Sequence, residues 1–359
     1  MEELLYQYWF LANPDINMAK KVRLLEYFGD SFNIFYSSKT DLMDSGLLKK
    51  DAILKFIENK AKWDLHEEYE KFCHSPFSFV TIENEKYPEK LRNIFDPPYG
   101  LFYVGNLPDF SNTVSIVGAR RCSAYGKKMA VELGRCLGEQ GYTVISGMAR
   151  GIDSHGHRGC LDGGGVTVAV LGCGCDVIYP KENNLLYEEI IKNGAVISEY
   201  QMGTAPLPQY FPLRNRIVSA LSDIVIVVEA REKSGSLITA DYALEQGKDI
   251  YAVPGRVGDA LSSGCIRLIA QGAGIVVSAE DFIKEITGEE KHPIEKINDN
   301  NIKLTKEQMA VYDLFDAYPK SIATAIEESG MDYLKMLSNI LSLERLGLLA
   351  EVFKNNYVR

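Results

Sequence analysis

Short, uninterrupted runs of apolar residues alternate with helical stretches from residue 113 onward. The runs are Val114–Val117, Thr143–Ile145, Thr167–Leu171, Ala195–Ile197, Ile224–Val228, Ile250–Val253 and Ile275–Val277. Because these runs are continuous rather than alternating, we expect both faces of each strand to be buried, as in a parallel sheet. Helical stretches such as 127–138, 184–193 and 236–245 lie between them. The pattern predicts a doubly wound α/β domain over residues 113–286, with ligands bound where the strands end.

The pattern is different at both ends of the chain. Apolar residues recur at helical spacing through residues 1–75, which predicts a small helical domain. Residues 76–112 are rich in proline, which predicts an extended linker or edge structure leading into the core. A polar segment, 287–303, predicts a second linker. Residues 304–359 offer three helices, the first opening at a capping box from Thr305, and a terminal hairpin, an order that predicts a winged helix.

The overall charge argues against a nucleic-acid protein until its distribution is considered. The 359 residues include 39 Lys and Arg against 49 Asp and Glu, a formal net charge of −10. Residues 113–284 are nearly neutral, and Arg120, Arg121, Lys127 and Lys128 stand close together without an acid between them. Because salt limits the field of a charge to about 8–10 Å, a local cationic groove is compatible with an acidic protein.

Composition excludes several classes of protein. Hydrophobic residues make up 46% and charged residues 25%, as in ordinary globular domains, and no apolar run is long enough to span a membrane. The first residues have no cationic start, so we expect no secretory signal. The seven cysteines are scattered, which predicts free thiols in a reducing cytoplasm and no metal site.

Three predicted strands run into glycine turns, at Gly118, Gly147 and Gly172. Glycine lets a backbone approach a ligand closely, and a following helix presents free N–H groups to a phosphate. The same glycines are also explained as tight turns between strand and helix. The dinucleotide fingerprint is incomplete and no P-loop motif occurs, so an NAD site is poorly supported and a Walker-type ATPase is excluded.

The segment Phe211-Pro-Leu-Arg214-Asn215-Arg216 follows a proline-rich loop, and its arginines are predicted to open a helix. An arginine at a helix start opposes the helix dipole, and a bound anion would remove this conflict. The alternative is a pair of arginines in surface ion pairs. Phe211 is suited to stacking on a base, although packing alone would also explain it.

Two further segments have more than one explanation. Residues 234–236 follow a strand and start a helix, which suits both an anion site and ordinary helix capping. For Asp153, His155 and His157 a structural hydrogen-bonding role is favoured over a metal site, because the other histidines lie in other predicted domains. No nucleophile with a matching base is recognisable. The pattern therefore favours a binding protein that is not an enzyme and needs no cofactor.

Taken together, these motifs closely resemble the DprA family, also called Smf, of DNA-processing proteins. The resemblance runs in order over roughly residues 80–280. The segments that carry it are Ile116-Val-Gly-Ala-Arg-Arg-Cys-Ser123, Ser146-Gly-Met-Ala-Arg-Gly-Ile-Asp153, Val168–Pro180, Phe211-Pro-Leu-Arg-Asn-Arg216, Ser234-Gly-Ser-Leu-Ile-Thr-Ala240 and Ala252-Val-Pro-Gly255. The resemblance implies a Rossmann-like, doubly wound core, mostly parallel, between an N-terminal helical (SAM-like) domain and a C-terminal winged helix.

The resemblance also implies a function. Family members are expected to form homodimers, to bind and protect single-stranded DNA without sequence preference, and to load RecA recombinase onto it in DNA uptake, natural transformation and homologous recombination. The residues implied to contact DNA are Gly118, Arg120, Arg121, Gly147, Arg150, Lys181, Phe211, Arg214, Asn215, Arg216, Ser234, Gly235 and Ser236. A cytoplasmic protein without membrane contact is expected.

This sequence departs from the family pattern at three places. Ile266 stands where the family commonly has Asn, and Gly156 stands where Ala usually precedes His157, which puts local loop geometry in doubt. The third predicted helix of the winged-helix domain has only Lys335 and Arg345 as cations. A helix that reads a DNA groove needs a positive face, so we expect a protein contact there instead.

Two rival functions remain. The core is also similar to phosphoribohydrolases that release a base from a nucleoside monophosphate, whose glycine-rich loop would correspond to residues 234–239. The catalytic glutamate of those enzymes is missing, because Ala240 and Asp241 stand at the matching place. The third hypothesis is a scaffold that acts chiefly through its two end domains.

Overall fold

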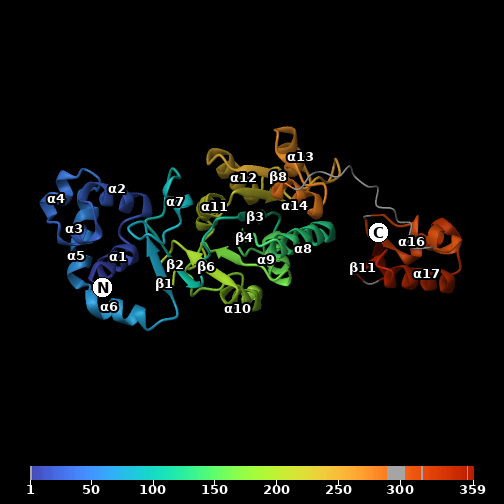
Figure 1. Ribbon diagram of the computed structural model, residues 1–359, viewed down its shortest axis with the longest axis horizontal. Coiled ribbons are helices and arrows are strands. Elements are labelled where there is room, and N and C mark those ends of the chain that lie inside the picture. Colours follow the sequence, from blue (N-terminus) through green and yellow to red (C-terminus); the bar gives the residue numbers. More distant parts are fainter. Residues whose placement is uncertain (1, 289–303, 317, 354) are drawn as a thin grey trace. The chain divides into compact units, whose positions relative to one another are not determined.

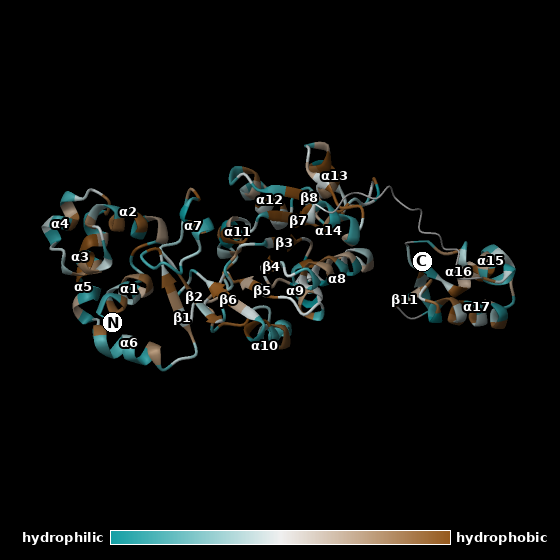
Figure 2. Ribbon diagram, viewed as in Figure 1, coloured by the Kyte–Doolittle hydropathy of each residue, from teal (hydrophilic) through white to brown (hydrophobic). Residues whose placement is uncertain are grey.

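A nine-stranded sheet organises the structure, which is a computed structural model that describes residues 2–288, 304–316, 318–353 and 355–359 (Figure 1). Its parallel strands are β3 (Thr113–Val117), β4 (Thr143–Ser146), β5 (Thr167–Val170), β6 (Gly194–Ser198), β7 (Ile224–Val227), β8 (Asp249–Ala252) and β9 (Gly274–Ile275). All residues of β3, β4, β5 and β6 are buried, which explains why these strands are mostly apolar (Figure 2). The strands predicted from these runs are confirmed.

The order of the parallel strands is β6-β5-β4-β3-β7-β8-β9. The chain builds outward from β3 to β6 and then returns to place β7 on the other side of β3, where Val117 pairs with Val227. The carboxyl ends of β3 and β7 therefore flank the point where the direction of winding reverses, and ligands of such sheets bind there. The predicted doubly wound, Rossmann-like core is confirmed.

Helices cover both faces of the sheet. On one face α8 (Ala124–Glu139), α9 (Ile152–Asp162) and α14 (Ala279–Thr287) pack against residues of β3, β4 and β7. On the other face lie α11 (Tyr210–Ala220), α12 (Gly235–Glu245) and α13 (Ser263–Ala270), while α10 (Asn184–Lys192) follows the short turn η1 (Lys181–Asn183). Gly156 lies in α9, where a Cβ would be 3.0 Å from Ile116 of β3, so an alanine would need only a small adjustment. Ile266 lies half-buried in α13.

Residues 76–112 contribute two strands to the sheet. β1 (Ser78–Thr81) and β2 (Gly100–Gly105) pair antiparallel with each other, and β2 pairs antiparallel with β6. A short helix, α7 (Glu89–Arg92), lies between them. The edge-structure interpretation of this segment is therefore the correct one, and the description as a linker is not.

Six helices precede the sheet. They are α1 (Glu2–Ala12), α2 (Met18–Phe28), α3 (Ser31–Tyr36), α4 (Lys39–Asp44), α5 (Lys50–Lys62) and α6 (Leu65–Cys73). They share a hydrophobic cluster with the sheet, because the rings of Phe10 and Tyr99 are 4.9 Å apart and those of Phe72 and Phe102 are 6.0 Å apart. The boundary expected near residue 75 thus separates helices from strands. Both belong to one compact unit, which extends from Met1 to Thr287.

A second unit, Gly288–Arg359, has its own core around Val311, Ile340 and Leu343. Its elements are α15 (Lys306–Tyr312), β10 (Lys320–Ser321), α16 (Ile322–Ser329), α17 (Tyr333–Arg345), β11 (Ala350–Phe353) and β12 (Asn356–Val358), with the strands in the order β10-β12-β11. The capping box predicted at Thr305 is present. This arrangement agrees with the predicted order of helices and hairpin, and the winged-helix assignment stays an interpretation.

Two further expectations concern the chain as a whole. The predicted linker 287–303 lies almost entirely outside the described residues. In the part of the chain that the structure describes, no helix has both the length and the apolar composition that crossing a bilayer requires.

Candidate nucleic-acid interface

A crevice of about 500 Å³ opens at the carboxyl ends of β3, β4 and β7, beside the point where the winding of the sheet reverses. The predicted residues that line it are Gly118, Arg120, Arg121, Gly147, Phe211, Arg214, Asn215, Ser234, Gly235 and Ser236. Segments that are far apart in the sequence are therefore brought to one rim of the sheet. Arg150, Lys181 and Arg216 are not among the residues that line this crevice.

Arg214 is a buried residue in the middle of α11, with 4% of its surface exposed. The helix begins at Tyr210, so the prediction that Arg214 and Arg216 open it is wrong. The guanidinium of Arg214 donates to the carbonyl oxygen of Gly147 at 2.8 Å and to that of Val170. A Cβ at Gly147 would lie 2.3 Å from Nη2 of Arg214, which explains the glycine. Arg214 therefore joins the ends of β4 and β5, although it borders the crevice.

The turns after β3 and β4 are already occupied by a carboxylate of the protein. Asp153 is buried, and the amide of Gly147 donates to its Oδ2 at 3.2 Å. Burial raises the pKa of Asp153, while the charge of Arg214 and the backbone amides of Ala149, Gly147 and Gly118 oppose this rise. These amides face an internal acid, so the structural interpretation of both glycine turns is supported.

A second carboxylate occupies the start of α8. The backbone amide of Ser123 donates to Glu229 at 2.9 Å, and the Ser123 hydroxyl donates to the same side chain at 2.5 Å. A Cβ at Gly126 would lie 2.4 Å from the Glu229 carboxyl carbon. Because Glu229 already balances the dipole of α8, no phosphate is needed at this helix start. The glycine turn after β5 is also structural, because a Cβ at Gly172 would lie 3.1 Å from the ring of Phe211.

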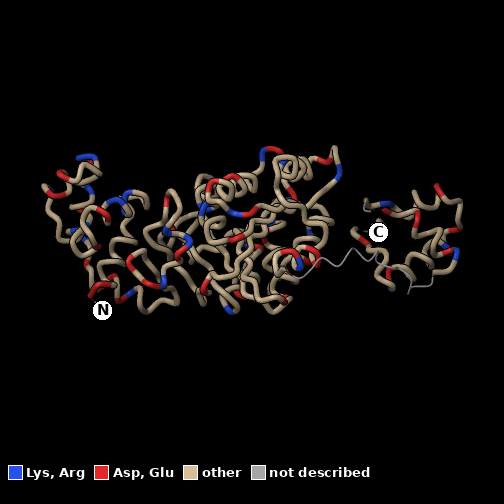
Figure 3. The backbone as a smooth tube through the Cα atoms, turned by 45° about the horizontal axis from the view of Figure 1, so that its top comes forward, with Lys and Arg blue, Asp and Glu red and all other residues tan. Residues whose placement is uncertain are grey.

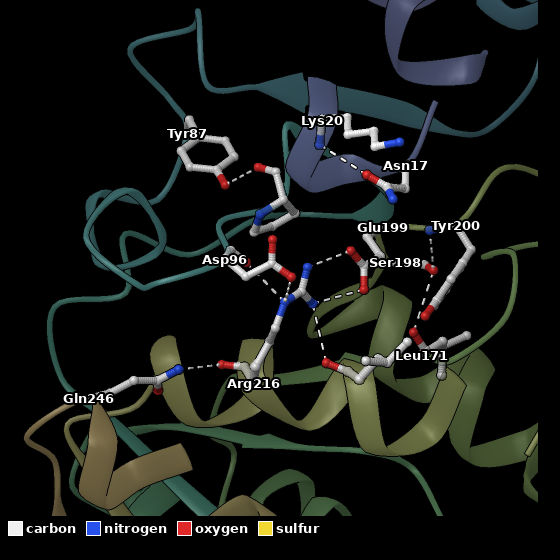
Figure 4. A network of polar contacts seen from close by, with 12 residues as sticks. Asn17, Lys20, Tyr87, Asp96, Leu171, Ser198, Glu199, Tyr200, Arg216 and Gln246 are labelled. Carbon is white, nitrogen blue, oxygen red and sulfur yellow. Dashed lines mark hydrogen bonds and ion pairs between the residues drawn. The ribbon is translucent and has the colours of Figure 1, made fainter. Parts of the chain in front are cut away.

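Arg216 does not line the crevice and instead forms a buried ion pair with Glu199 (Figure 4). Its guanidinium donates to the two carboxylate oxygens of Glu199 at 2.8 and 2.7 Å, and its Nε donates to the carbonyl oxygen of Asp96 at 2.9 Å. Burial opposes the charge on Arg216, but the pairing with Glu199 outweighs it and the pKa is raised. Of the two explanations for this arginine, the ion pair is correct, and the pair is buried rather than on the surface.

The open cationic groups of the crevice come from loops. Arg120 and Arg121 follow β3 and Arg231 follows β7, and all three are exposed. Among the described residues none of them pairs with a carboxylate. The guanidinium of Arg120 lies 5.4 Å from the ring centroid of Phe211, which is half-buried. Lys and Arg are otherwise interspersed with Asp and Glu along the chain (Figure 3), so this group is a local feature.

The amino end of α12 borders the same crevice. Ser234 occupies the N-cap position without a capping hydrogen bond, and its hydroxyl lies 2.5 Å from that of Ser236. Asn215 donates to the carbonyl oxygen of Gly235 at 3.1 Å, which joins α11 to this turn. Side-chain capping therefore does not explain Ser234 or Ser236. Unlike the start of α8, this helix start has no carboxylate of the protein bonded to it among the described residues.

Arg150 lies in a small hollow next to the crevice, and Lys181 is exposed outside both. The hollow has a volume of about 60 Å³ and shares Arg120, Phe211 and Arg214 with the crevice. Arg150 pairs there with Glu182 of η1, and both side chains are more than half exposed. The arginines predicted to contact DNA thus fall into two groups: exposed arginines of loops, and the buried Arg214 and Arg216 of α11.

His157 has a structural environment. His157 is buried, and its Nδ1 lies 2.6 Å from the hydroxyl of Thr167, which in turn donates to the carbonyl oxygen of Val144 at 2.7 Å. Since that hydroxyl proton is used, His157 donates to Thr167 as the neutral Nδ1–H form. Burial lowers the pKa of His157 to about 3, so the ring stays neutral. Within the described ranges no three His, Cys, Asp or Glu side chains gather as a metal site would require.

Sequence reasoning missed two residues of this region, because Arg231 lines the crevice and Tyr179 lines the hollow. The hydrogen-bonding role favoured for Asp153 agrees with its contact to the amide of Gly147. Arg231 follows a predicted strand, which was a usable signal. Nothing local to Tyr179 indicates its place, because its ring meets Phe211 only through the fold, at 5.5 Å between centroids.

The fold and the site define a class: a Rossmann-like α/β protein whose switch-point crevice presents arginines and an aromatic ring instead of a dinucleotide fingerprint. The sequence profile of the DNA recombination-mediator protein A family matches residues 78–287. The chain belongs to this family, as the resemblance to DprA/Smf proteins indicated.

Relatives and solved structures support the assignment. The chain is 43% identical over 249 residues to DNA processing protein DprA of Streptococcus pneumoniae, covering 68% of this chain and 86% of the relative. It is 42% identical over 209 residues to DprA of Bacillus subtilis, covering 58% of this chain and 70% of the relative. The X-ray structure of S. pneumoniae DprA superposes with a TM-score of 0.68 at 35% identity, covering 78% of this chain and 97% of that one.

A further structure concerns DNA. Its subject is the single-stranded DNA binding mode of DNA processing protein A from Helicobacter pylori. It matches this chain with a TM-score of 0.54 at 32% identity, covering 60% of this chain and 97% of that one.

Proposed function

We propose that this protein binds single-stranded DNA in the crevice without reading its sequence, protects it, and hands it to a RecA recombinase in natural transformation and recombination. The observation that carries the proposal is the group of exposed arginines, Arg120, Arg121 and Arg231, which have no carboxylate partner among the described residues and surround one crevice. Uncompensated guanidinium groups at a concave site favour a ligand with several negative charges.

The chemistry of the crevice suits a strand rather than a single anion. Guanidinium groups bind phosphates, which every nucleotide carries, and Phe211 offers an aromatic ring that accepts any base. Neither contact distinguishes one base from another. The proposal is further supported by the structure of the H. pylori relative, which concerns that protein's single-stranded DNA binding mode.

The test is a fluorescence-anisotropy titration of a labelled oligo(dT) at several salt concentrations. We expect Arg120→Ala, Arg121→Ala and Arg231→Ala each to weaken binding about tenfold, since a charge-assisted hydrogen bond is worth about 1.5 kcal/mol or more. Each lost phosphate contact also lowers the slope of log K against log salt by about 0.7.

The matched control is Arg23→Ala, because Arg23 is an exposed arginine of α2. This variant loses the same charge and should bind like the wild type. If the three crevice variants also bind like the wild type, or if affinity does not depend on salt, the crevice is not the DNA site.

The handover to a recombinase is supported by the name of the family, which describes a recombination mediator. We propose that the second unit contacts a protein rather than DNA, because Leu334 and Leu341 of α17 are 73% and 49% exposed and the helix has few cations. Removing residues 304–359 and measuring RecA filament growth on coated single strands tests this step. Lost loading with intact DNA affinity is the expected result.

We also propose a homodimer formed at the open edge of the sheet. Leu244 of α12 and Ile275 of β9 are 73% and 47% exposed, and Val277 beyond β9 is 70% exposed. Apolar side chains around an unpaired strand edge favour association with another copy. Sedimentation of the wild type and of Leu244→Glu tests this, with a monomeric variant expected.

The enzymatic alternative has little support. The only carboxylate among the described residues that line the crevice is Asp153, which is buried and engaged with backbone amides. Ala240, at the position of the missing glutamate, is buried in α12. Release of free base from nucleoside monophosphates would overturn this interpretation, and we expect none.

A further inference from the structure

The ring of Phe211 is already in contact with other groups of the site. The guanidinium of Arg120 lies 5.4 Å from its centroid, the ring of Tyr179 lies 5.5 Å away at an angle of 34°, and the turn at Gly172 approaches its edge. A base that stacks on Phe211 would therefore share the ring with these neighbours. Tyr179 lies next to Phe211 and is 41% exposed.

The ring of Tyr179 contacts Phe211 and still leaves an aromatic surface exposed. Its hydroxyl has no hydrogen-bond partner among the described residues, whereas Tyr187 donates to the carbonyl oxygen of Cys175 at 2.8 Å and Tyr125 to that of Pro254 at 3.2 Å. Tyr187 and Tyr125 thus use their hydroxyl groups within the fold, and Tyr179 does not. An exposed tyrosine offers a ligand both an apolar ring and a polar hydroxyl.

The surroundings of Tyr179 suit a nucleotide. Tyr179 and Pro180 form one wall of the hollow next to the crevice, and Arg150 lies at the same hollow. With a volume of about 60 Å³ the hollow is too small to enclose a base, so a base would lie on the ring at the surface. Arg150 pairs with exposed Glu182, and exposed pairs of this kind are weak, so a phosphate can compete for the guanidinium.

We propose that Tyr179 is a second stacking surface, which holds one base of the strand beyond Phe211, and that Arg150 exchanges Glu182 for the adjacent phosphate. This inference rests on the proposed function and extends the site by one nucleotide past the crevice. The hollow shares Arg120 and Phe211 with the crevice, so a strand can pass from one to the other without leaving the surface.

The experiment compares oligo(dT) with an abasic tetrahydrofuran oligomer of the same length. Tyr179→Ala should weaken binding of oligo(dT) about tenfold, which corresponds to one lost stacking contact. Binding of the abasic strand and the salt slope should stay unchanged, because no phosphate contact is lost. Tyr179→Phe should bind like the wild type, since the ring is sufficient. Tyr27→Ala, at an exposed position of α2, is the matched control.

A second measurement uses Tyr179→Trp. The chain has two tryptophans, Trp9 and Trp63, both in the N-terminal helical region, so the wild type supplies the background signal. We expect oligo(dT) to quench the new fluorescence and the abasic strand to leave it unchanged.

Equal weakening of both strands by Tyr179→Ala would show that the ring only supports the loop, and no weakening of either would show that no base stacks there. Either result overturns the inference while the proposed function stands. If the wild type binds neither strand, the proposed function fails and this inference fails with it.

Discussion

Two sets of arginines border the same end of the sheet, and they differ in what surrounds their charges. Arg214 and Arg216 belong to α11, are buried, and have their guanidinium groups hydrogen-bonded to carbonyl oxygens or to Glu199. Arg120 and Arg121 belong to the loop after β3, are exposed, and have no carboxylate partner among the described residues. The same chemical group therefore holds the fold together in one region and stays available to a ligand in the other.

The difference shows that the guanidinium groups of the motif Phe211–Arg216 are engaged within the fold. Arg216 ties α11 to Asp96, before β2, and to Glu199, after β6. Arg214 ties the ends of β4 and β5 together. Substitution of the buried arginines should therefore change stability, and substitution of the exposed arginines should change affinity.

The largest effect is expected for Arg216→Ala. The change leaves the buried carboxylate of Glu199 without its partner, which costs about 3–5 kcal/mol of unfolding free energy. Arg216→Lys should restore little, because an ammonium group cannot donate to both oxygens in the same geometry. Urea unfolding followed by circular dichroism measures this, with Arg23→Ala as a control that stays within about 0.5 kcal/mol of the wild type. Wild-type stability of Arg216→Ala would remove the distinction between the two sets.

A smaller loss of unfolding free energy, which depends on pH, is expected for Arg214→Met. Burial raises the pKa of Asp153 and Arg214 opposes this, so the pKa rises further in the variant. A carboxyl whose pKa is higher in the folded protein stabilises it most at low pH, below the pKa of the unfolded chain, and this contribution is lost as the pH rises. The deficit of the variant should therefore grow from about pH 4 toward neutral pH, reaching about 3 kcal/mol.

The control for this pH dependence is the double variant Asp153→Asn with Arg214→Met, which has no carboxyl to titrate at this place. Its deficit relative to the wild type should vary less with pH than that of Arg214→Met. Chemical unfolding at a series of pH values measures both. Parallel curves for the single and the double variant would contradict the coupling between Asp153 and Arg214.

The smallest effect, on affinity for DNA, is expected for Glu182→Ala, which removes the partner of Arg150. Removal of this exposed carboxylate frees Arg150, so affinity for oligo(dT) should rise about twofold to threefold at low salt and return to the wild-type value at high salt. Anisotropy titrations at both salt concentrations measure it. Weaker binding by Glu182→Ala would indicate that the carboxylate positions Arg150 for the strand instead of competing with it.

Much of the fold and part of the site follow from the sequence. The strand runs, the glycine turns and the capping box at Thr305 are local patterns, and the structure contains all of them. The start of α11 was misplaced because Pro212 lies inside its first turn. A proline is tolerated there, since the missing N–H would have no partner within the helix.

What the sequence by itself determined is the doubly wound sheet and many of the residues that line the crevice at its rim. Burial on both faces of a strand leaves a mostly apolar run, which is visible locally. Only the tertiary structure decided which arginines are free. The partners of Arg216 lie 17 and 120 residues away, and Asp153 and Glu229 fill turns that were expected to be open to phosphate. The direction of a long charged side chain depends on which carboxylates and carbonyl oxygens the fold brings within hydrogen-bonding distance. The order of residues along the chain does not reveal which of these groups come that close.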